Sequence, residues 1–401
     1  MIWEKAYYDN NLNGFAVPIK VENNHEYREK LEKIYKEYIK HLKHPAFVYT
    51  EGLLDCIGEE VKEIIRALDY LIKDDKDAAD IILSKIIDLF GNDSFIISNL
   101  DNTYSFRAIA PFEDLHSEGY DKEYRKMMDT ELTFFRVRTK NKTDKKTDIS
   151  EIEHILHLPY NLKHKTSSMR FSDKGLPGLY LSTTTYACSQ ECNWNKDEED
   201  LYASVFIPNE EGKKLKILNL TISQSLISGI FDRKYYDNRR EALQVSMLKI
   251  FPLVIATSFS VSTDESIKYQ YLLSQALMRV VCKKGIDGIA YFSMKGKDEF
   301  EFPQGVNLAI PATDISESNL YSQKCRGFEI SKPIPYSEVC KQECQSAKSY
   351  INTIYTEDND FDKKSVTTKV EIDGKMRFYG DTDLGKFDDY LTAQIKCPLK
   401  K

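Results

Sequence analysis

The first part of the chain carries hydrophobic positions at intervals of three and four, which is the spacing of one face of an α-helix. Between His25 and Leu42 this stripe consists of Tyr27, Leu31, Ile34, Tyr35, Tyr38 and Ile39. The same spacing recurs in Leu53–Ile72 and in Asp77–Phe90, after which Gly91-Asn92-Asp93 provides a stop. The pattern predicts three helices that pack on one another as a helical domain over residues 1–125.

From about residue 130 the hydrophobic pattern changes to short strand-like runs mixed with helical segments. This mixture predicts an α+β domain over residues 130–312. The predicted strands are Leu132–Val137, Leu179–Leu181, Leu201–Ile207, Leu215–Ile222, Leu253–Val261 and Ile289–Ser293, and the predicted helices are Arg239–Ile250 and Ile267–Cys282.

Residues 313–401 form a C-terminal extension with a looser composition, which we expect to pack on the preceding domain. Within it, Tyr336–Tyr355 reads as a helix, and Lys369–Tyr379, centred on Asp373-Gly374, reads as a β-hairpin.

Composition narrows the class of protein. The chain has 401 residues, 41% of them hydrophobic and 30% charged, as in a folded globular protein with two or three domains. No apolar run approaches the roughly eighteen residues needed to cross a bilayer, and the amino terminus lacks the pattern of a secretory signal. We therefore expect a cytoplasmic protein without a membrane partner.

The charge and the cysteines exclude two further classes of function. A formal net charge of −7 argues against a broad nucleic-acid-binding face, which needs clustered lysine and arginine. The eight cysteines are expected to be reduced thiols. Cys188 with Cys192, and Cys340 with Cys344, are each spaced by four but have no nearby histidines, so no metal is expected.

The segment from Ser168 to Glu191 is the most informative part of the chain. It places Arg170, Tyr180 and Glu191 at offsets of ten and eleven residues. Gly175, Pro177 and Gly178 interrupt any helix between them, so the chain must double back. A short strand then follows, and a helix begins with Thr183 or Thr184 as its cap. This path would allow the three side chains to converge.

Together with Phe134–Arg138 upstream, this arrangement resembles the RES domain family, which is named for an arginine, a glutamate and a serine. Further segments match the family in the expected order, so the resemblance covers roughly residues 130 to 312. These segments are Ile155–His164, Phe251–Phe259, Gly288–Ser293 and Asn307–Pro311.

The resemblance implies a fold like that of ADP-ribosyltransferases, with a split, mainly antiparallel β-sheet, preceded by a helical domain that resembles the HEPN type of some longer members. The helical region has no arginine followed four to six residues later by a histidine, the pair that many HEPN nucleases use. We therefore expect this region to be structural or regulatory.

The resemblance also implies an activity, namely cleavage of the nicotinamide N-glycosidic bond of NAD. Arg136 and Arg170 would hold the pyrophosphate, because a guanidinium group offers a planar fork of donors to phosphate oxygens. Tyr180 would position the nicotinamide ribose, and Glu191 would stabilise the oxocarbenium-like centre. Arg138 shares a strand face with Arg136 and is an alternative to it.

The remaining candidates are less tightly defined. Ser293 and Ser258 compete for the family's serine, with Ser293 preferred because it precedes the Asn307–Pro311 segment as expected. His157 could contact phosphate or substrate. Tyr271 and Gln275, four residues apart on one helix face, could line the same site or pack in the core.

NAD is thus the expected substrate, with water or inorganic phosphate as acceptor and no metal. The family's role would be toxin-like or in phage defence, which implies an antitoxin or regulatory protein as partner. Two alternatives stay open: transfer of ADP-ribose to a macromolecule, and a non-catalytic module that senses a nucleotide. Whether the chain forms a homo-oligomer also stays open.

Overall fold

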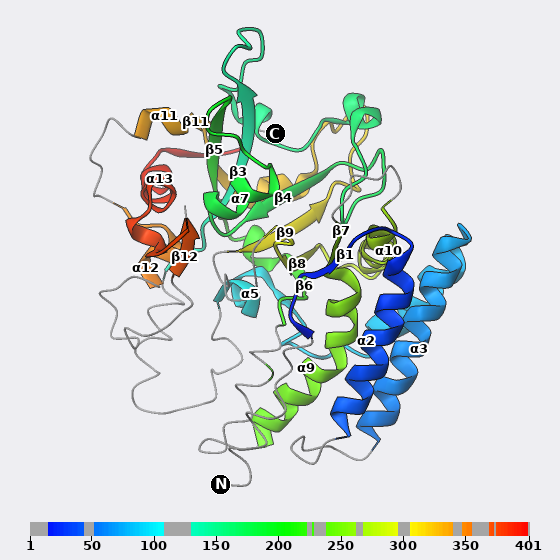
Figure 1. Ribbon diagram of the computed structural model, residues 1–401. Helices are drawn as coiled ribbons and strands as arrows, with labels where there is room; N and C mark the ends of the chain where they lie inside the picture. The colour runs from blue at the N-terminus through cyan, green and yellow to red at the C-terminus, as the bar shows by residue number, and fades with distance from the viewer. Residues whose placement is uncertain are drawn as a thin grey trace, which may run out of the picture. The chain divides into compact units, whose positions relative to one another are not determined.

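The computed structural model describes residues 15–43, 52–107, 130–222, 227, 238–261, 268–295, 305–339, 347–354, 369–372 and 374–399 (Figure 1). The chain divides into two compact units. The first unit contains residues 1–98, 168–173 and 217–289, and the second contains residues 99–167, 174–216 and 290–401.

These units differ from the three contiguous domains predicted above, 1–125, 130–312 and 313–401. Two later helices join the N-terminal helices in the first unit, and the C-terminal residues belong to the second unit. Hydrophobic periodicity shows which face of an element is buried, but it does not show which segment far along the chain covers that face.

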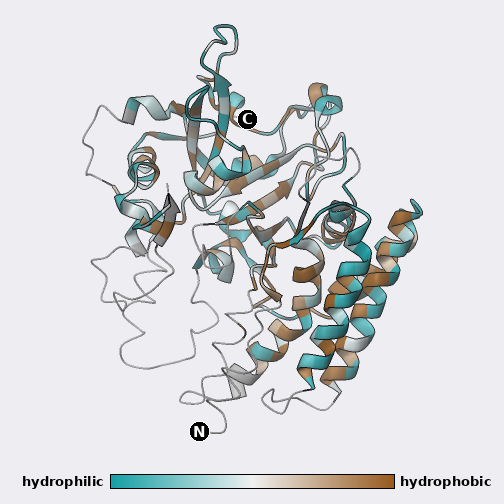
Figure 2. Ribbon diagram, viewed as in Figure 1, coloured by the Kyte–Doolittle hydropathy of each residue, from teal (hydrophilic) through white to brown (hydrophobic). Residues whose placement is uncertain are grey.

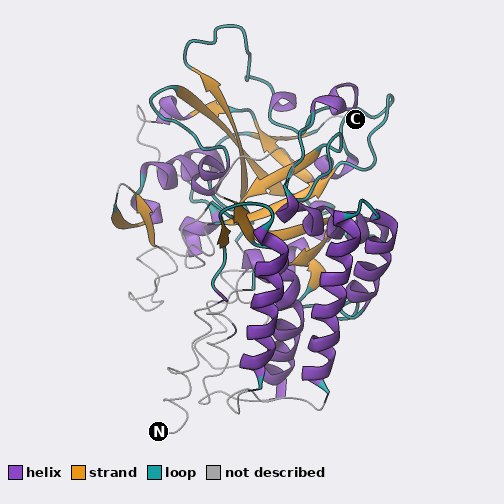
Figure 3. Ribbon diagram, turned by 45° about the vertical axis from the view of Figure 1, so that its right-hand side comes forward, coloured by secondary structure: helices purple, strands orange, loops and turns teal. Residues whose placement is uncertain are grey.

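The first unit is mainly helical, and the three predicted N-terminal helices are confirmed. They pack with two later helices, side by side in both ribbon views (Figure 1, Figure 3). Figure 2 shows both hydrophilic and hydrophobic residues on α2 and α3. The helices are α2 (Glu26–Leu42), α3 (Leu53–Ile72), α4 (Lys76–Asp88), α9 (Asn238–Thr257) and α10 (Tyr269–Lys283), and the strands are β1 (Ile19–Val21), β2 (Ile97–Asn99), β6 (Lys216–Asn219) and β7 (Phe259–Val261).

The apolar stripe of α2 is buried apart from Ile39, which is half-buried, and it carries three tyrosines whose hydroxyl groups donate to backbone carbonyls of α9. Tyr27 donates to the carbonyl of Ala256 (2.9 Å), Tyr35 to that of Pro252 (2.7 Å) and Tyr38 to that of Leu248 (2.9 Å). The acceptors are spaced by four residues, one helical turn apart, so the two helices are fixed in register.

The prediction of a strand over Leu253–Val261 is wrong. Helix α9 continues through Pro252 to Thr257, and only Phe259–Val261 is a strand, paired in parallel with β1. Every residue from Ile250 to Phe259 is buried, so the segment shows no amphipathic period that would distinguish helix from strand. Pro252 cannot donate to the carbonyl of Leu248, and the hydroxyl of Tyr38 takes that place.

The second unit is built on a mostly antiparallel sheet, so the α+β class is confirmed. Its strands lie in the order β14-β10-β5-β3-β4-β9-β8, with β11 also paired to β5. The predicted strands around residues 134, 179, 201 and 289 correspond to β3, β4, β5 and β8. The bounds are β3 (Phe134–Asn141), β4 (Gly178–Ser182), β5 (Glu199–Pro208), β8 (Gly288–Phe292), β9 (Val306–Pro311), β10 (Phe328–Ser331), β11 (Ile334–Pro335) and β14 (Lys396–Pro398).

Strand β3 pairs with its two neighbours, β5 and β4, over very different lengths. Strands β3 and β5 pair over eight residues, from Phe134 to Asn141, whereas the register of β3 with β4 is the one pair Phe135–Ser182. The side chain of Arg136 reaches the backbone of β4 beyond this pair.

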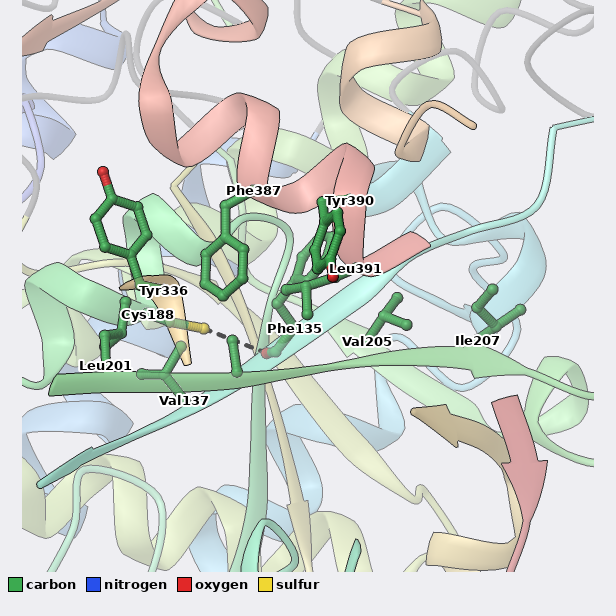
Figure 4. Packing of buried hydrophobic residues seen from close by; sticks show 11 residues of the cluster. Phe135, Val137, Cys188, Leu201, Val205, Ile207, Tyr336, Phe387, Tyr390 and Leu391 are labelled. Carbon is green, nitrogen blue, oxygen red and sulfur yellow. Dashed lines mark hydrogen bonds between the residues drawn. The ribbon is translucent and has the colours of Figure 1, made fainter. Parts of the chain in front are cut away.

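Short helices cover one face of this sheet, and the C-terminal residues supply much of the cover. Phe387, Tyr390 and Leu391 pack against Phe135 and against residues of β5 in one buried cluster (Figure 4). The helices of the second unit are α5 (Tyr104–Arg107), α7 (Thr185–Glu191), α11 (Tyr336–Val339), α12 (Tyr350–Ile354) and α13 (Asp383–Thr392).

The two predictions for the C-terminal region had different outcomes. The hairpin is confirmed as β12 (Lys369–Ile372) paired with β13 (Lys375–Phe378), and Gly374 has a positive φ of 73°, which glycine tolerates. The continuous helix over Tyr336–Tyr355 is wrong: α11 and α12 are short, and residues 347–349 between them are not helical. Residues 340–346 and Tyr355 lie outside the described residues.

Candidate functional site

Glu191 is the last residue of α7, the helix that directly follows β4. Gly178 begins β4, after a turn in which Gly175 has a φ of 84°. The predicted cap is confirmed as Thr184, whose side chain accepts a hydrogen bond from the backbone of Ala187 (3.1 Å). The local sequence therefore sets both the start of α7 and the place of Glu191 at its end.

Two residues bind the carboxylate of Glu191, and a third residue binds one of these two. Its Oε1 accepts hydrogen bonds from the hydroxyl of Ser293 (2.8 Å), which directly follows β8, and from the amide of Asn307 (2.7 Å) in β9. The amide oxygen of Asn307 accepts in turn from the hydroxyl of Ser182 in β4. We call Glu191, Ser293, Asn307 and Ser182 the glutamate cluster.

The cluster distinguishes the two competing serines. Ser293 contacts Glu191, whereas Ser258 belongs to the first unit, where its backbone carbonyl accepts from the amide of Ile19 (2.9 Å). Asn307 and Ser182 were not predicted as site residues. The asparagine that opens the Asn307–Pro311 segment was a usable signal for the first, whereas nothing in the sequence singled out Ser182.

Arg136, in β3, is a cation without a carboxylate partner among the described residues. One terminal nitrogen donates to the backbone carbonyl of Tyr180 (2.8 Å), while the Nε atom is buried and has no hydrogen-bond partner. Burial lowers the pKa of Arg136 to about 10, and the neighbouring charge of Arg138 adds to this effect. A half-buried guanidinium group with a buried, unpaired Nε is costly unless an anion compensates it.

Arg138 lies two residues further along β3, on the same face of the strand. It donates to the carbonyls of His154 (3.0 Å) and Leu156 (2.8 Å), and burial lowers its pKa as well. Phe135 and Val137, which alternate with the two arginines, pack in the buried cluster with α7 and α13. The side chains of Arg136 and Arg138 therefore project from the opposite face of β3.

The thiol of Cys192 lies within electrostatic range of both arginines and of Glu191. Cys192 is exposed, and partial desolvation by its surroundings raises the pKa of its thiol; Arg136 and Arg138 oppose the rise, and Glu191 adds to it. Cys192 caps the C-terminal end of α7 directly after Glu191. The charges of Arg136, Arg138 and Glu191 thus act on one small region of the second unit.

Tyr180 contacts Arg136 through its backbone, so the role predicted for its side chain stays a prediction, whereas the contacts of the His157 ring are defined. The carbonyl of Tyr180 accepts from Arg136, and its side chain is half-buried. His157 is buried, its Nε2 accepts from the amide of Ser322 (3.0 Å), and its Nδ1 lies 2.7 Å from the carbonyl of Leu158. The ring is therefore neutral with the proton on Nδ1, in agreement with a pKa lowered by burial, and both nitrogens bind the protein's own backbone.

The other four candidates form a group within the first unit. Arg170 donates to the carbonyls of Thr257 (2.8 Å) and Phe259 (2.9 Å), on either side of Ser258, and lies over the ring of Tyr271 at 4.9 Å. The amide of Gln275 donates to Ser168 Oγ (2.7 Å) and to the carbonyl of Met169 (2.8 Å). Tyr271 and Gln275 thus hold the turn that carries Arg170.

Metal-binding groups and membrane-spanning helices are two further features that would define the class of site. Among the described residues, no group of three or more histidine, cysteine or acidic side chains could hold a metal ion. Cys340 and Cys344 lie outside those residues. No helix in the described ranges combines the length and the apolar composition needed to cross a membrane.

Comparison with known proteins shows a similarity to a named protein. The chain is 26% identical over 267 residues to a protein of Bacillus subtilis (strain 168) named "Putative toxin YopC". The match covers 64% of this chain and 55% of the relative, so it spans about half the relative's length. No protein-family model matches the chain. No solved structure matches it either.

Proposed function

We propose that this protein consumes NAD by cleaving the bond between nicotinamide and ribose. The observation that carries the proposal is the hydrogen bond of Ser293 to Glu191 across 102 residues of sequence, because these are the serine and glutamate that the resemblance to the RES family selects. Arg136, one of the two arginines predicted to hold the pyrophosphate, lies in the same unit and lacks a counter-charge among the described residues.

In this proposal the pyrophosphate of NAD supplies the anion that Arg136 lacks. A phosphate oxygen would accept from the buried Nε and from a terminal nitrogen, which is the two-point geometry that suits a guanidinium group. Arg138 adds positive charge on the same strand face. The phosphate-binding role predicted for Arg170, which lies in the first unit, stays a prediction.

Glu191 acts on the charge that develops during cleavage. The C1′–N bond breaks with its electron pair passing to the nicotinamide nitrogen, which becomes neutral, while positive charge develops on the ribose. A carboxylate that is already oriented by Ser293 and Asn307 stabilises that charge without reorganising. Water then adds at C1′ and loses a proton, giving ADP-ribose; inorganic phosphate in its place gives the 1-phosphate ester.

The relative's name supports a toxin-like role, in which loss of NAD stops growth and an antitoxin protein restrains the enzyme. Expression of the chain in a bacterial host should arrest growth and deplete NAD, and Glu191→Gln should relieve both effects. Growth arrest with unchanged NAD would contradict the proposal and favour transfer of ADP-ribose to a macromolecule.

The direct test is incubation of the purified protein with NAD, with and without inorganic phosphate. Release of free nicotinamide together with ADP-ribose, or with its phosphate ester, supports the proposal. Nicotinamide release with label retained on a macromolecule supports the transferase. Intact NAD with measurable binding would contradict the proposal and support a nucleotide-sensing module.

A further inference from the structure

The C-terminal helix α13 touches the helix that carries Glu191. Asp388, which is fully buried in α13, accepts a hydrogen bond at Oδ1 from the backbone amide of Thr185, the first residue of α7 (3.1 Å). Its Oδ2 accepts from the hydroxyl of Tyr379 (2.5 Å), which is itself buried. A side chain 203 positions along the chain therefore satisfies one of the free amides at the start of α7.

The same region of α13 also holds α7 by packing. Phe387 and Leu391 lie in one buried cluster with Cys188 of α7 and Phe135 of β3, as the close-up shows (Figure 4). The thiol of Cys188 donates to the carbonyl of Phe135 (3.2 Å), so α7 is fixed against the sheet along its length. The start of the helix is fixed by Thr184 and Asp388, and its end is fixed by the bonds to Glu191.

We propose that Asp388 is a positioning residue for Glu191: by fixing the first turn of α7, it sets where the Glu191 carboxylate meets Ser293 and Asn307. The C-terminal segment is then a required part of the glutamate cluster's support. This inference rests on the proposed function only for its catalytic consequence, because the contact between Asp388 and α7 exists whatever the reaction is.

Asparagine is the conservative substitute at this position. Burial raises the pKa of Asp388 to about 8, so the neutral carboxyl group predominates at pH 7, and an amide of the same shape still accepts from Thr185. Leucine keeps the branched shape but is larger and offers no acceptor to Thr185 or Tyr379. Asp389 provides a matched control on the same helix, because it accepts from the amide of Ser349 (2.7 Å) and from Asn352 (2.8 Å) rather than from α7.

The experiment measures alkylation of individual cysteines by mass spectrometry in the full-length protein. Cys188 is buried in α7, and Cys325, buried elsewhere in the second unit, reports on global unfolding. Asp388→Leu should raise the alkylation rate of Cys188 about tenfold or more through local opening, with Cys325 unchanged. Asp388→Asn and Asp389→Leu should leave Cys188 protected.

The catalytic arm uses nicotinamide release. Asp388→Leu should lower kcat about tenfold or more with little change in KM for NAD, and Asp388→Asn should restore kcat. If the wild-type protein releases no nicotinamide, the proposed function fails, while protection of Cys188 still decides whether Asp388 fixes α7. If Asp388→Leu does not fold, Tyr379→Phe replaces it, with a smaller rise in Cys188 alkylation expected. Protection of Cys188 in the folded variant, or equal exposure of Cys325, would overturn the inference.

Discussion

Ser293 donates a hydrogen bond of 2.8 Å to the carboxylate of Glu191, although 102 positions of sequence separate the two residues. The bond connects the end of α7 to the residue after β8, and Asn307 completes it from β9. The carboxylate is therefore oriented by the sheet, and its effect on a bound substrate should depend on both donors.

Replacing Ser293 by alanine should lower kcat for nicotinamide release by about 10- to 100-fold, because a hydrogen bond to a charged group contributes roughly 1.5–3 kcal/mol. Ser258→Ala is the matched control. Because Ser258 lies in the first unit, this substitution should leave kcat unchanged. Steady-state kinetics with NAD measure both variants. Loss of activity in Ser258→Ala but not in Ser293→Ala would reverse the assignment.

Arg136→Met should remove the stabilisation that ADP-ribose gives to the folded protein. For the wild type, a ligand at a hundred times its Kd adds about 2.7 kcal/mol to the free energy of unfolding, which thermal denaturation detects as a higher Tm. The variant should show no such rise at the same concentration. An equal rise in both proteins would show that Arg136 does not bind the ligand.

The same substitution at Arg279 provides a contrast. Arg279 pairs with Asp80 (2.8 Å) and Asp173 (3.0 Å), so Arg279→Met leaves the buried Asp80 with fewer partners and should lower the Tm without ligand. Arg136 has no such partner among the described residues, so Arg136→Met should lower it less. A larger loss for Arg136→Met would contradict the view that Arg136 is an uncompensated charge.

Stability should fall as the pH rises from about 5 to 8, and Asp388 should account for part of this fall. Burial raises the pKa of Asp388 to about 8, compared with about 3.9 in the unfolded chain, so the folded state holds a proton that the unfolded state loses. The contribution is complete below pH 4, declines by at most about 1.4 kcal/mol per pH unit, and is lost above pH 8.

Urea denaturation of the wild type and of Asp388→Asn across this range measures the effect. The free energy of unfolding of the variant should decline less steeply with pH. Burial also raises the pKa of Asp389 and of Tyr379, but both groups are present in both proteins, so the difference between the slopes reports on Asp388. Identical slopes would show that Asp388 does not titrate between these limits.

Tyr38 should contribute more to stability than Tyr35, although both donate to α9. Leu248 lacks its usual helical donor because Pro252 has no amide hydrogen, so Tyr38→Phe leaves a buried carbonyl unsatisfied, at a cost of about 1–3 kcal/mol. Tyr35→Phe removes a hydrogen bond to the carbonyl of Pro252. In helical geometry this carbonyl can also accept from the amide of Ala256, so the substitution should cost about 1 kcal/mol or less.

A double-mutant cycle with Pro252→Ala tests this explanation. Alanine restores the amide at position 252, so Tyr38→Phe should cost less in that background. Measured free energies of unfolding that add without coupling would contradict the link between Tyr38 and Pro252.

The sequence predicted most accurately those elements whose pattern is local. Three amphipathic helices were found to within a residue or two, and the path from the Gly175 turn through β4 to the Thr184 cap follows from glycine, proline and capping chemistry. The segment Leu253–Val261 failed because it is buried on all sides, and its helix depends on a hydroxyl from α2 that no local pattern shows.

The site was predicted only in part for a related reason. Glu191 and Ser293 lie together, whereas His157, which could have contacted phosphate or substrate, binds backbone with both ring nitrogens. The sequence does not single out Asp388, because an aspartate in a helical pattern usually faces solvent. Only its partners Thr185 and Tyr379 show that it is buried and hydrogen-bonded.

The most direct test of the account is the release of nicotinamide from NAD by the wild-type protein and by Glu191→Gln. The account predicts that the wild type releases nicotinamide, and that the variant is slower by about a hundredfold or more while it binds ADP-ribose more tightly than Arg136→Ala does. Equal rates for the wild type and Glu191→Gln, or NAD left intact by the wild type, would contradict it.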